Sequence, residues 1–415
     1  MSRPSFITKL SSFLILSLYI IAIFLTFFLI VILSHGVGLA AEVTWDEPTA
    51  LVTQKYLNDT KPAIYPEGSL TDNKVSVTVD VNAGIFGGYT YLKAPGDIAV
   101  SRNQVYISGV SQGLHLMGGY VQSFKINANA VTTDNFILIR DSHGQFALGA
   151  RTDIYGDISK KETNYSYSLR NEIQIFNSTF DSEVVGGGAY LDNTYGNAEA
   201  NHNKVYFDGG SAKAIYGGLA ETHADFNGVA KASDNIVYLK DVSVNNNVYV
   251  GAIHVYDSGE AINNKLTLTG QISIGENLRG GYYSRKSPCE GVCDFFSGNV
   301  LSVVRPQKDG ARVGANLGNF EEYNFLFSSL APSGSVGLLV EGEISLNDGQ
   351  GRGSRLASFN LANDGVPTEP ELELVLMSSP NMAIDYEDFE TPADSVESLG
   401  PLLAYDLKFD QQPNK

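Results

Sequence analysis

The stretch Asn203-Lys204-Val205-Tyr206-Phe207 is followed 32 residues later by Asn235-Ile236-Val237-Tyr238-Leu239. In both stretches an asparagine precedes a run in which apolar residues alternate with others, the pattern of a β-strand with one buried face. Six further copies bring the total to eight, and the leading asparagines are 30, 32, 36, 32, 32, 29 and 35 residues apart. This spacing identifies an internal repeat. The other copies begin at Asn73, Asn103, Asn135, Asn171, Asn264 and Asn299.

Each asparagine block is followed by a second block built on small residues. In five repeats adjacent glycines lie between larger residues, as in Leu116-Met117-Gly118-Gly119-Tyr120. In three repeats a single glycine precedes alanine, as in Leu148-Gly149-Ala150. Glycine within a strand pattern marks a bend or a close approach of another backbone. We therefore expect one of these two features at the glycine block of every repeat.

The repeat predicts an all-β fold, an elongated parallel β-solenoid (β-helix) of about eight units. A unit of about 32 residues is too short to bury its own apolar face, so neighbouring units must stack. Stacked strands lie about 4.8 Å apart, which lets equivalent asparagines form hydrogen-bonded ladders. Tyr89, Tyr120, Tyr190 and Tyr282 are expected to stack in a similar outer or inner row. The alternative is a β-sandwich or propeller whose strands merely share this spacing.

Residues 1–41 have the features of an export signal. Arg3 and Lys9 give a basic start, residues 13–33 carry no charge, and the segment ends in small residues with a peptidase site after Ala40 or Ala41. The apolar run is also long enough to cross a bilayer core of about 30 Å, so a retained anchor is the alternative. In both cases the remainder is expected outside the cytoplasm, with membrane contact only through residues 13–33.

The charge of the chain argues against a nucleic-acid partner. The 415 residues include 28 Lys and Arg against 46 Asp and Glu, a formal net charge of −18. Binding to phosphates requires a cationic surface, which this composition does not supply. The 42 glycines and 22 tyrosines favour short strands and many turns.

Cys289 and Cys293, the two cysteines of the chain, lie close together in a loop-like stretch that contains Pro288 and Gly291. In an oxidising compartment they are a candidate disulfide that closes a small loop. Two unpaired surface thiols are the alternative. The stretch has too few Cys and His residues for a metal site, so no metal ligands are predicted.

The paired Asn-x-Val-x-Val and Gly-Gly-Tyr blocks, behind a long signal sequence, resemble the passenger regions of bacterial autotransporters. The resemblance covers roughly residues 71–345 and implies a secreted β-helical surface protein, in many cases an adhesin. Residues 323–346 are similar to the end of such a passenger. Autotransporters then continue into a membrane β-barrel, whereas this chain ends in Gln411-Gln412-Pro413-Asn414-Lys415 without a series of amphipathic strands. The resemblance therefore implies a passenger that lacks its translocator.

On this interpretation the chain has five parts. Residues 1–41 are the signal peptide or anchor, and residues 42–70 are an N-terminal cap or linker. Residues 71–345 are the solenoid, residues 346–380 are C-terminal cap strands, and residues 381–415 are an acidic flexible tail. The acidic character is clear, because residues 361–400 contain ten Asp or Glu and no Lys or Arg.

β-Helices also form polysaccharide lyases and hydrolases, whose catalytic sites need clustered acidic or basic residues. The strongest local candidate is Arg140-Asp141-Ser142-His143-Gly144, but we expect His143 to face solvent in a turn. His115 and His202 are expected at rim or turn positions. No nucleophile elbow, phosphate loop, dinucleotide fingerprint or tandem calcium motif occurs. The sequence therefore predicts no catalytic, cofactor-binding or metal residues, and no cofactor.

The sequence predicts a non-catalytic protein of a bacterial cell surface or outer membrane, adhesin-like or structural, or secreted. Its expected partner is a glycan or protein of a host or cell surface, because tyrosine and asparagine combine flat apolar area with hydrogen bonding. The alternatives are a carbohydrate-active β-helix enzyme and a truncated passenger without present activity.

Overall fold

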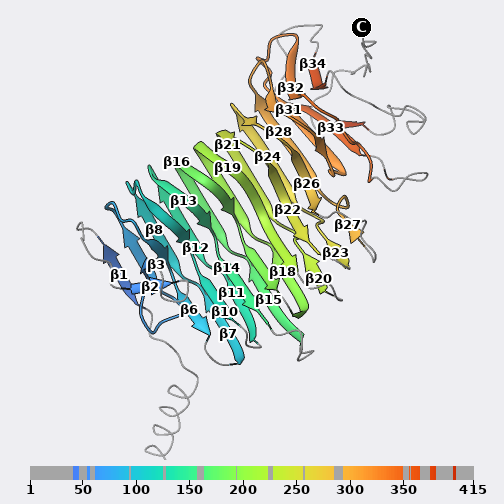
Figure 1. Ribbon diagram of the computed structural model, residues 1–415. Coiled ribbons are helices and arrows are strands. Elements are labelled where there is room, and N and C mark those ends of the chain that lie inside the picture. The colour runs from blue at the N-terminus through green and yellow to red at the C-terminus, as the bar shows by residue number, and fades with distance from the viewer. Residues whose placement is uncertain are drawn as a thin grey trace, which may run out of the picture. The chain divides into compact units, whose positions relative to one another are not determined.

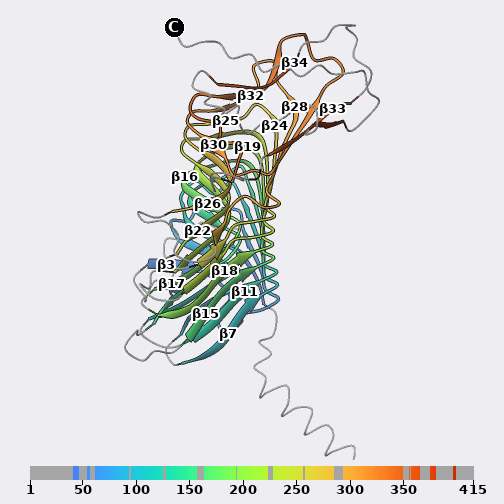
Figure 2. The same ribbon diagram turned by 90° about the vertical axis from the view of Figure 1, so that its right-hand side faces the viewer.

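Successive turns of the chain stack as a parallel β-solenoid in the computed structural model of the protein (Figures 1 and 2). Strand pairing is parallel throughout the named strands except between β2 and β3. This confirms the predicted all-β solenoid and excludes a sandwich or propeller. The described residues contain no helix. They are residues 41–45, 54–56, 61–92, 95–124, 128–156, 163–192, 194–222, 228–255, 258–284, 293–348, 355, 357–364, 374–379 and 396–398.

A complete turn has four strand segments, which form faces A to D of the solenoid. Face A begins after the leading asparagine. It contains β1 (Glu42–Trp45), β4 (Lys74–Val77), β8 (Gln104–Ser108), β12 (Phe136–Arg140), the starts of β16 (Glu172–Val185), β19 (Lys204–Thr222) and β21 (Ile236–Val244), then β24 (Lys265–Gly270), β28 (Val300–Pro306), β31 (Glu322–Phe327), β33 (Ser358–Asn363) and β35 (Val396–Ser398).

Face B follows face A and leads to the glycine block. It contains β3 (Lys61–Ile64), β5 (Gly84–Phe86), β9 (Gly113–Met117), β13 (His143–Leu148), later parts of β16, β19 and β21, then β25 (Ser273–Ile274), β29 (Ala311–Val313), β32 (Ser335–Val340) and β34 (Leu374–Ser378). β2 (Gln54–Tyr56) pairs antiparallel with β3.

Face C begins after the glycine block. It contains β6 (Tyr89–Leu92), β10 (Tyr120–Phe124), β14 (Arg151–Tyr155), β17 (Gly188–Asp192) and the end of β19. β22 (Val248–His254), β26 (Leu278–Tyr283) and β30 (Leu317–Gly318) follow at the corner of faces B and C.

Face D is a separate seven-stranded sheet that closes the turn. It contains β7 (Gly96–Ser101), β11 (Ala128–Thr133), β15 (Thr163–Leu169), β18 (Tyr195–Asn201), β20 (Gly228–Lys231), β23 (Ser258–Glu260) and β27 (Cys293–Asp294).

The leading asparagines form a buried ladder at the corner between faces D and A. Oδ1 of Asn135 accepts hydrogen bonds from N and Nδ2 of Asn103, at 3.1 and 2.9 Å. Asn135 donates from the same two atoms to Oδ1 of Asn171, at 3.1 and 3.0 Å. This pair of bonds recurs in each step from Asn171 to Asn264. The leading asparagines are at most 1% exposed, so the expected ladder is part of the interior.

The residue before each ladder asparagine has a left-handed backbone, which the repeat pattern did not predict. The φ angle there lies between 54° and 65°. Left-handed geometry costs an L-residue about 1–2 kcal/mol, which the buried ladder must offset. In the early turns these residues alternate in charge, so that Arg102 bonds Asp72 and Arg170 bonds Asp134. The set is Asp72, Arg102, Asp134, Arg170, His202, Asp234, Asn263 and Gly298.

A second asparagine ladder also escaped prediction. It lies where the chain approaches the glycine block in the later turns. Oδ1 of Asn247 accepts from N and Nδ2 of Asn277, at 3.0 and 2.9 Å, and Oδ1 of Asn277 accepts from N of Asn316 at 3.2 Å. These residues lack the alternating apolar run that marks the first ladder, so spacing alone did not distinguish them.

The glycine blocks form the corner between faces B and C, where the chain touches the asparagine ladder of the opposite wall. A Cβ on Gly87 would lie 2.7 Å from Cβ of Asn103, and one on Gly118 would lie 2.9 Å from Cβ of Asn135. Nδ2 of Asn73 donates to the carbonyl oxygen of Gly87 at 3.0 Å. Side chains are excluded at Gly87 and Gly118, which confirms the predicted close approach there.

This contact divides the interior into two apolar cores. The larger core lies between faces A and B and includes Val105, Ile107 and Leu116. The second core lies between faces C and D. It includes Val121 and several alanines of face D such as Ala130. The cross-section of a turn therefore has two lobes, and the corner between faces B and C bends inward between them.

Strands also extend the stack beyond the predicted solenoid range of 71–345. β1 pairs with β4 and β3 pairs with β5 at one end, while β33, β34 and β35 continue faces A and B at the other. Of the predicted tail, residues 381–415, the structure describes 396–398, which form β35. The predicted signal segment lies outside the described residues except for Ala41.

We expect Asn171→Ala to destabilise the protein by about 2–4 kcal/mol. The substitution removes the acceptor of two buried donors on Asn135, whose desolvation is then uncompensated. Urea unfolding followed by circular dichroism measures the effect. Asn197→Ala is the matched control, because Asn197 lies on the outer side of β18, and it should change stability by about 0.5 kcal/mol at most. Equal losses in the two variants would contradict a structural role for the ladder.

We expect Gly118→Ala to cost about 3 kcal/mol or more, because the added methyl group would overlap Asn135 and the carbonyl oxygen of Gly149. Gly318→Ala is the control, since its Cβ would meet Cβ of Ser345 at 3.1 Å and nothing else closer than 3.5 Å. Thermal unfolding of both variants compares them. A Gly118 variant as stable as the Gly318 variant would show that the two walls are not in tight contact.

Candidate functional site

The inward bend brings apolar side chains of faces B and C together on the outside of the solenoid. Leu116 belongs to the inner core, so the next residue, Met117, points to the opposite side of its strand. The same alternation places Tyr120 outside and Val121 inside. We call the resulting set the outer cluster. It consists of Ala63, Tyr65, Phe86, Tyr89, Met117, Tyr120, Phe146, Leu148, Val185, Tyr190, Tyr216, Leu219, Tyr249, Ala252 and Tyr282.

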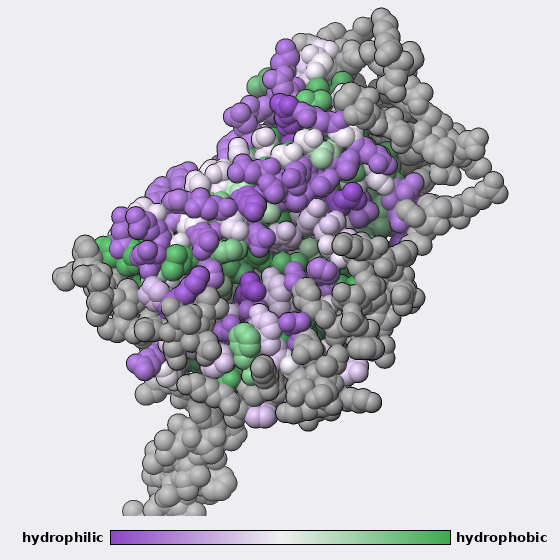
Figure 3. Space-filling view, viewed as in Figure 1, coloured by the Kyte–Doolittle hydropathy of each residue, from purple (hydrophilic) through white to green (hydrophobic). Residues whose placement is uncertain are grey.

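The outer cluster contains aromatic rings in contact from turn to turn. Tyr89 and Tyr120 have ring centroids 5.5 Å apart, and Phe86 lies 5.9 Å from Tyr120 across the glycine corner. In the later turns Tyr249 and Tyr282 stack at 3.9 Å. Figure 3 shows apolar residues across the middle of this side, with polar residues beside them. Tyr89 and Tyr120 therefore lie in one row as predicted, with their rings in contact but tilted by 33° and not stacked.

The prediction is wrong for Tyr190. The register pairs Gly188 with Arg151, which is the position of Tyr120 in the preceding turn, whereas Tyr190 pairs with Asp153 two residues further along. The third glycine of residues 186–188 occupies the tyrosine position. Tyr282 does occupy the row of Tyr89 and Tyr120, but its stacking partner is Tyr249 from the other side of the glycine corner.

Charged residues interrupt the aromatic row at its centre. Nε of Arg151 donates to Oδ1 of Asp153 at 2.7 Å, and the hydroxyl of Tyr120 donates to Oδ2 of the same carboxylate at 2.8 Å. The Arg151 guanidinium lies 4.0 Å from the centroid of the Tyr190 ring, a cation–π geometry. The Asp153 side chain is 3% exposed and that of Arg151 is 28% exposed. This arrangement fixes both groups while part of the Arg151 side chain stays accessible.

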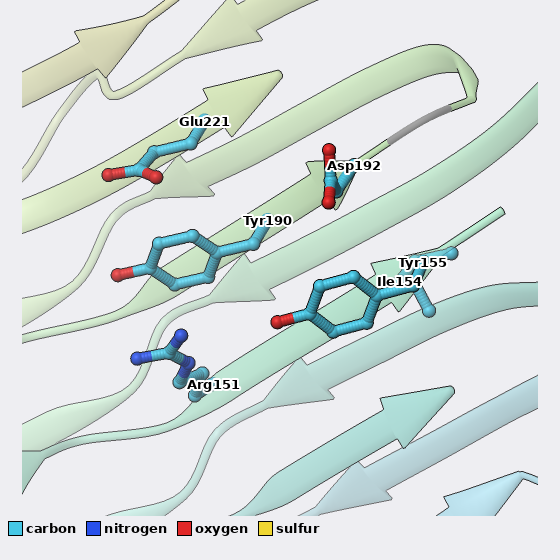
Figure 4. Close-up of a pocket in the computed structure, with 6 residues that line it drawn as sticks. All are labelled: Arg151, Ile154, Tyr155, Tyr190, Asp192 and Glu221. Carbon is cyan, nitrogen blue, oxygen red and sulfur yellow. The ribbon is translucent and has the colours of Figure 1, made fainter. Parts of the chain in front are cut away.

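A pocket of about 250 Å³ lies beside this charged group. Figure 4 shows that the polar ends of Tyr155, Tyr190 and Glu221 point to the same side from three different strands. Sequence reasoning missed the pocket because its residues are widely separated and share no motif. Its lining residues are Arg151, Ile154, Tyr155, Tyr190, Asp192 and Glu221.

Glu183 lies on face B near the same charged group. Burial raises its pKa, the charge of Arg151 opposes this rise, and the charge of Glu221 adds to it. Burial likewise raises the pKa of Tyr190 well above its ordinary value. Perturbed titratable groups that gather beside a pocket are typical of functional sites, so this region is the candidate site.

The histidines singled out in the sequence are not part of this pocket. His143 starts β13, and its Nε2 lies 2.9 Å from Oδ1 of Asp181, with 46% of the histidine side chain exposed. His202 has left-handed backbone geometry at the asparagine corner, as expected for a turn. His115 contradicts the expected rim position, because it lies within β9 with its ring 4.9 Å from that of Phe146. The strand reaches this residue because the glycine block begins only at Gly118.

The structure describes one of the two cysteines of the predicted disulfide. Cys293 begins β27 on face D, while Cys289 lies outside the described residues, so the pairing stays a prediction. Within the described ranges no three Cys, His, Asp or Glu side chains are placed to hold a metal ion. The same residues include no helix with the length and apolar character that crossing a membrane requires.

Comparison of the chain with protein-family models, curated proteins and solved structures finds no match.

Stability should depend on pH through His115. Burial, with smaller contributions from the charges of Lys61 and Arg151, lowers its pKa to about 4. An unfolded chain takes up this proton near pH 6.5. The folded state is therefore penalised as the pH falls from about 6.5 to 4, by roughly 2–3 kcal/mol.

Urea unfolding of His115→Gln at pH 7.0 and 4.5 checks this expectation. The loss of stability between these pH values should be about 2 kcal/mol smaller in the variant than in the unmodified protein. Asn197→Ala, which removes no titratable group, should leave the pH dependence unchanged. Parallel pH curves for His115→Gln and the unmodified protein would disprove the assignment.

Proposed function

We propose that the protein is an exported bacterial surface protein whose solenoid acts as a non-catalytic, adhesin-like binding module. The features of residues 1–41 support export, and the resemblance of residues 71–345 to autotransporter passengers supports a surface location. The ligand is a glycan or protein of a host or cell surface. The observation that carries the proposal is the outer cluster, which presents aromatic side chains beside hydrogen-bonding groups over successive turns.

The outer cluster suits binding because its side chains are already ordered. Six of its aromatic residues are partly exposed while their neighbours in adjacent turns hold them: Tyr65, Tyr89, Phe146, Tyr190, Tyr216 and Tyr282. Contacts such as the 5.1 Å separation of Tyr65 and Tyr89 limit the rotamers of both rings. A ligand therefore gains flat apolar contact at little cost in side-chain entropy.

The double variant Tyr89→Ala/Tyr282→Ala tests the proposal. It removes two partly exposed rings from opposite ends of the outer cluster, and we expect binding to cultured cells and to a glycan array to fall at least tenfold. Tyr206→Ala/Tyr238→Ala is the matched control, since these rings stack at 4.8 Å on the outer side of face A. The purified full-length protein is used throughout, and circular dichroism verifies folding. Unchanged binding in the first variant overturns the proposal.

Glu183 favours a carbohydrate-active enzyme as the second candidate. Burial raises the pKa of this carboxyl group, whereas Asp153 accepts hydrogen bonds from Arg151 and Tyr120. Two carboxyl groups in unlike environments suit an acid and a base in glycoside cleavage. The enzyme would replace the binding-only proposal if the protein cleaves polysaccharides, if Glu183→Gln abolishes this activity and if His143→Ala keeps it.

A further inference from the structure

The stack of aromatic rings on the outer side of face C ends at the pocket. The rings of Phe124 and Tyr155 are nearly parallel, with centroids 4.3 Å apart and an interplanar angle of 9°. The equivalent position in the next turn is Asp192. Its side chain is too short to cover the second face of the Tyr155 ring. The pocket lies there, because Tyr155 and Asp192 both line it.

The size of the pocket limits the ligand to one small ring. Its volume of about 250 Å³ is below the range of about 300–1,000 Å³ that is usual for drug-sized ligands. A ring that enters it takes the place next to Tyr155 that an aromatic side chain would otherwise occupy. The apolar face of the ligand ring then stacks on tyrosine, as in other aromatic recognition sites.

The charges around the pocket favour a ligand that is rich in hydroxyl groups and carries no charge. Asp192 and Glu221 line the pocket and would repel an anion, while Arg151 would repel a cation. A hydroxyl group both donates to a carboxylate and accepts from a guanidinium, so it satisfies both kinds of side chain. Apart from the bond from Nε to Asp153, no hydrogen bond joins the Arg151 guanidinium to the part of the chain that the structure describes. Its Nη atoms are therefore suited to donate to a ligand.

We propose that this pocket binds one neutral pyranose ring of a glycan, which stacks on Tyr155 and hydrogen-bonds Arg151, Asp192 and Glu221. The inference rests on the proposed binding function and adds the class of ligand and its contact residues. The rest of the glycan chain continues along the outer cluster, where tyrosines occur in the turns on both sides.

Asp192→Phe is the decisive variant, because it extends the stack of Phe124 and Tyr155 into the pocket. We expect calorimetric titration with β-1,4-glucohexaose, α-1,4-glucohexaose and β-1,4-mannohexaose to show at least one complex. The variant should weaken that complex at least tenfold without lowering the melting temperature. Asp192→Asn keeps the side-chain size and should weaken it several-fold. Asp181→Phe is the matched control, since Asp181 is 67% exposed and lies outside the pocket.

Three outcomes overturn the inference. In the first, none of the neutral hexasaccharides binds the unmodified protein. In the second, hexagalacturonate or chitosan hexamer binds more tightly than the neutral probes. In the third, Asp192→Phe binds as the Asp181→Phe control does. The proposed function fails separately, when Tyr89→Ala/Tyr282→Ala still binds cells. If Tyr89→Ala/Tyr282→Ala loses cell binding and Asp192→Phe keeps it, the proposed function holds and the pyranose site is rejected.

Discussion

The contact between the asparagine ladder and the glycine corner is the constraint on which the rest of the structure depends. An amide buried inside a solenoid must hydrogen-bond to the turns above and below it, and this requirement fixes the register of the turns from Asn73 to Asn299. The glycines let the opposite wall reach the amides, as the bond from Asn73 to Gly87 shows. A Cβ at Gly87 would hold the two walls apart and leave a wider interior for the apolar side chains to fill.

The same contact determines the outer surface. Because the corner between faces B and C bends inward, residues on both sides of the glycines meet outside the solenoid, as Phe86 and Tyr120 do. A polar ladder in the interior thus gives rise to an apolar cluster on the exterior, whose rings are held by neighbours in the adjacent turns. Binding to such a cluster requires little reordering of side chains.

The fold was largely predictable because its main determinants recur in the sequence at the period of the turn. Leading asparagines, alternating apolar residues and glycines each recur once in a turn, and the parallel solenoid that they predict is the fold observed. The candidate site was not predictable in the same way. Arg151, Tyr190 and Glu221 come from three turns and belong to no common motif, so only the register reveals that they line one pocket. Tyr190 shows the limit most clearly, because Gly188 and Ala189 precede it and place it two residues beyond the expected position.

The centre of the outer cluster differs from what stability alone would favour. The rings of Tyr89 and Tyr120 are in contact, and a third tyrosine in place of Arg151 would extend the same row. Instead the chain places a cation there and a nearly buried carboxylate two residues later. Desolvating such a pair costs free energy that apolar side chains of similar volume do not lose. The neighbouring turns have no charged side chains at the equivalent positions, so the fold does not require this pair. A ligand is the simplest reason for its presence.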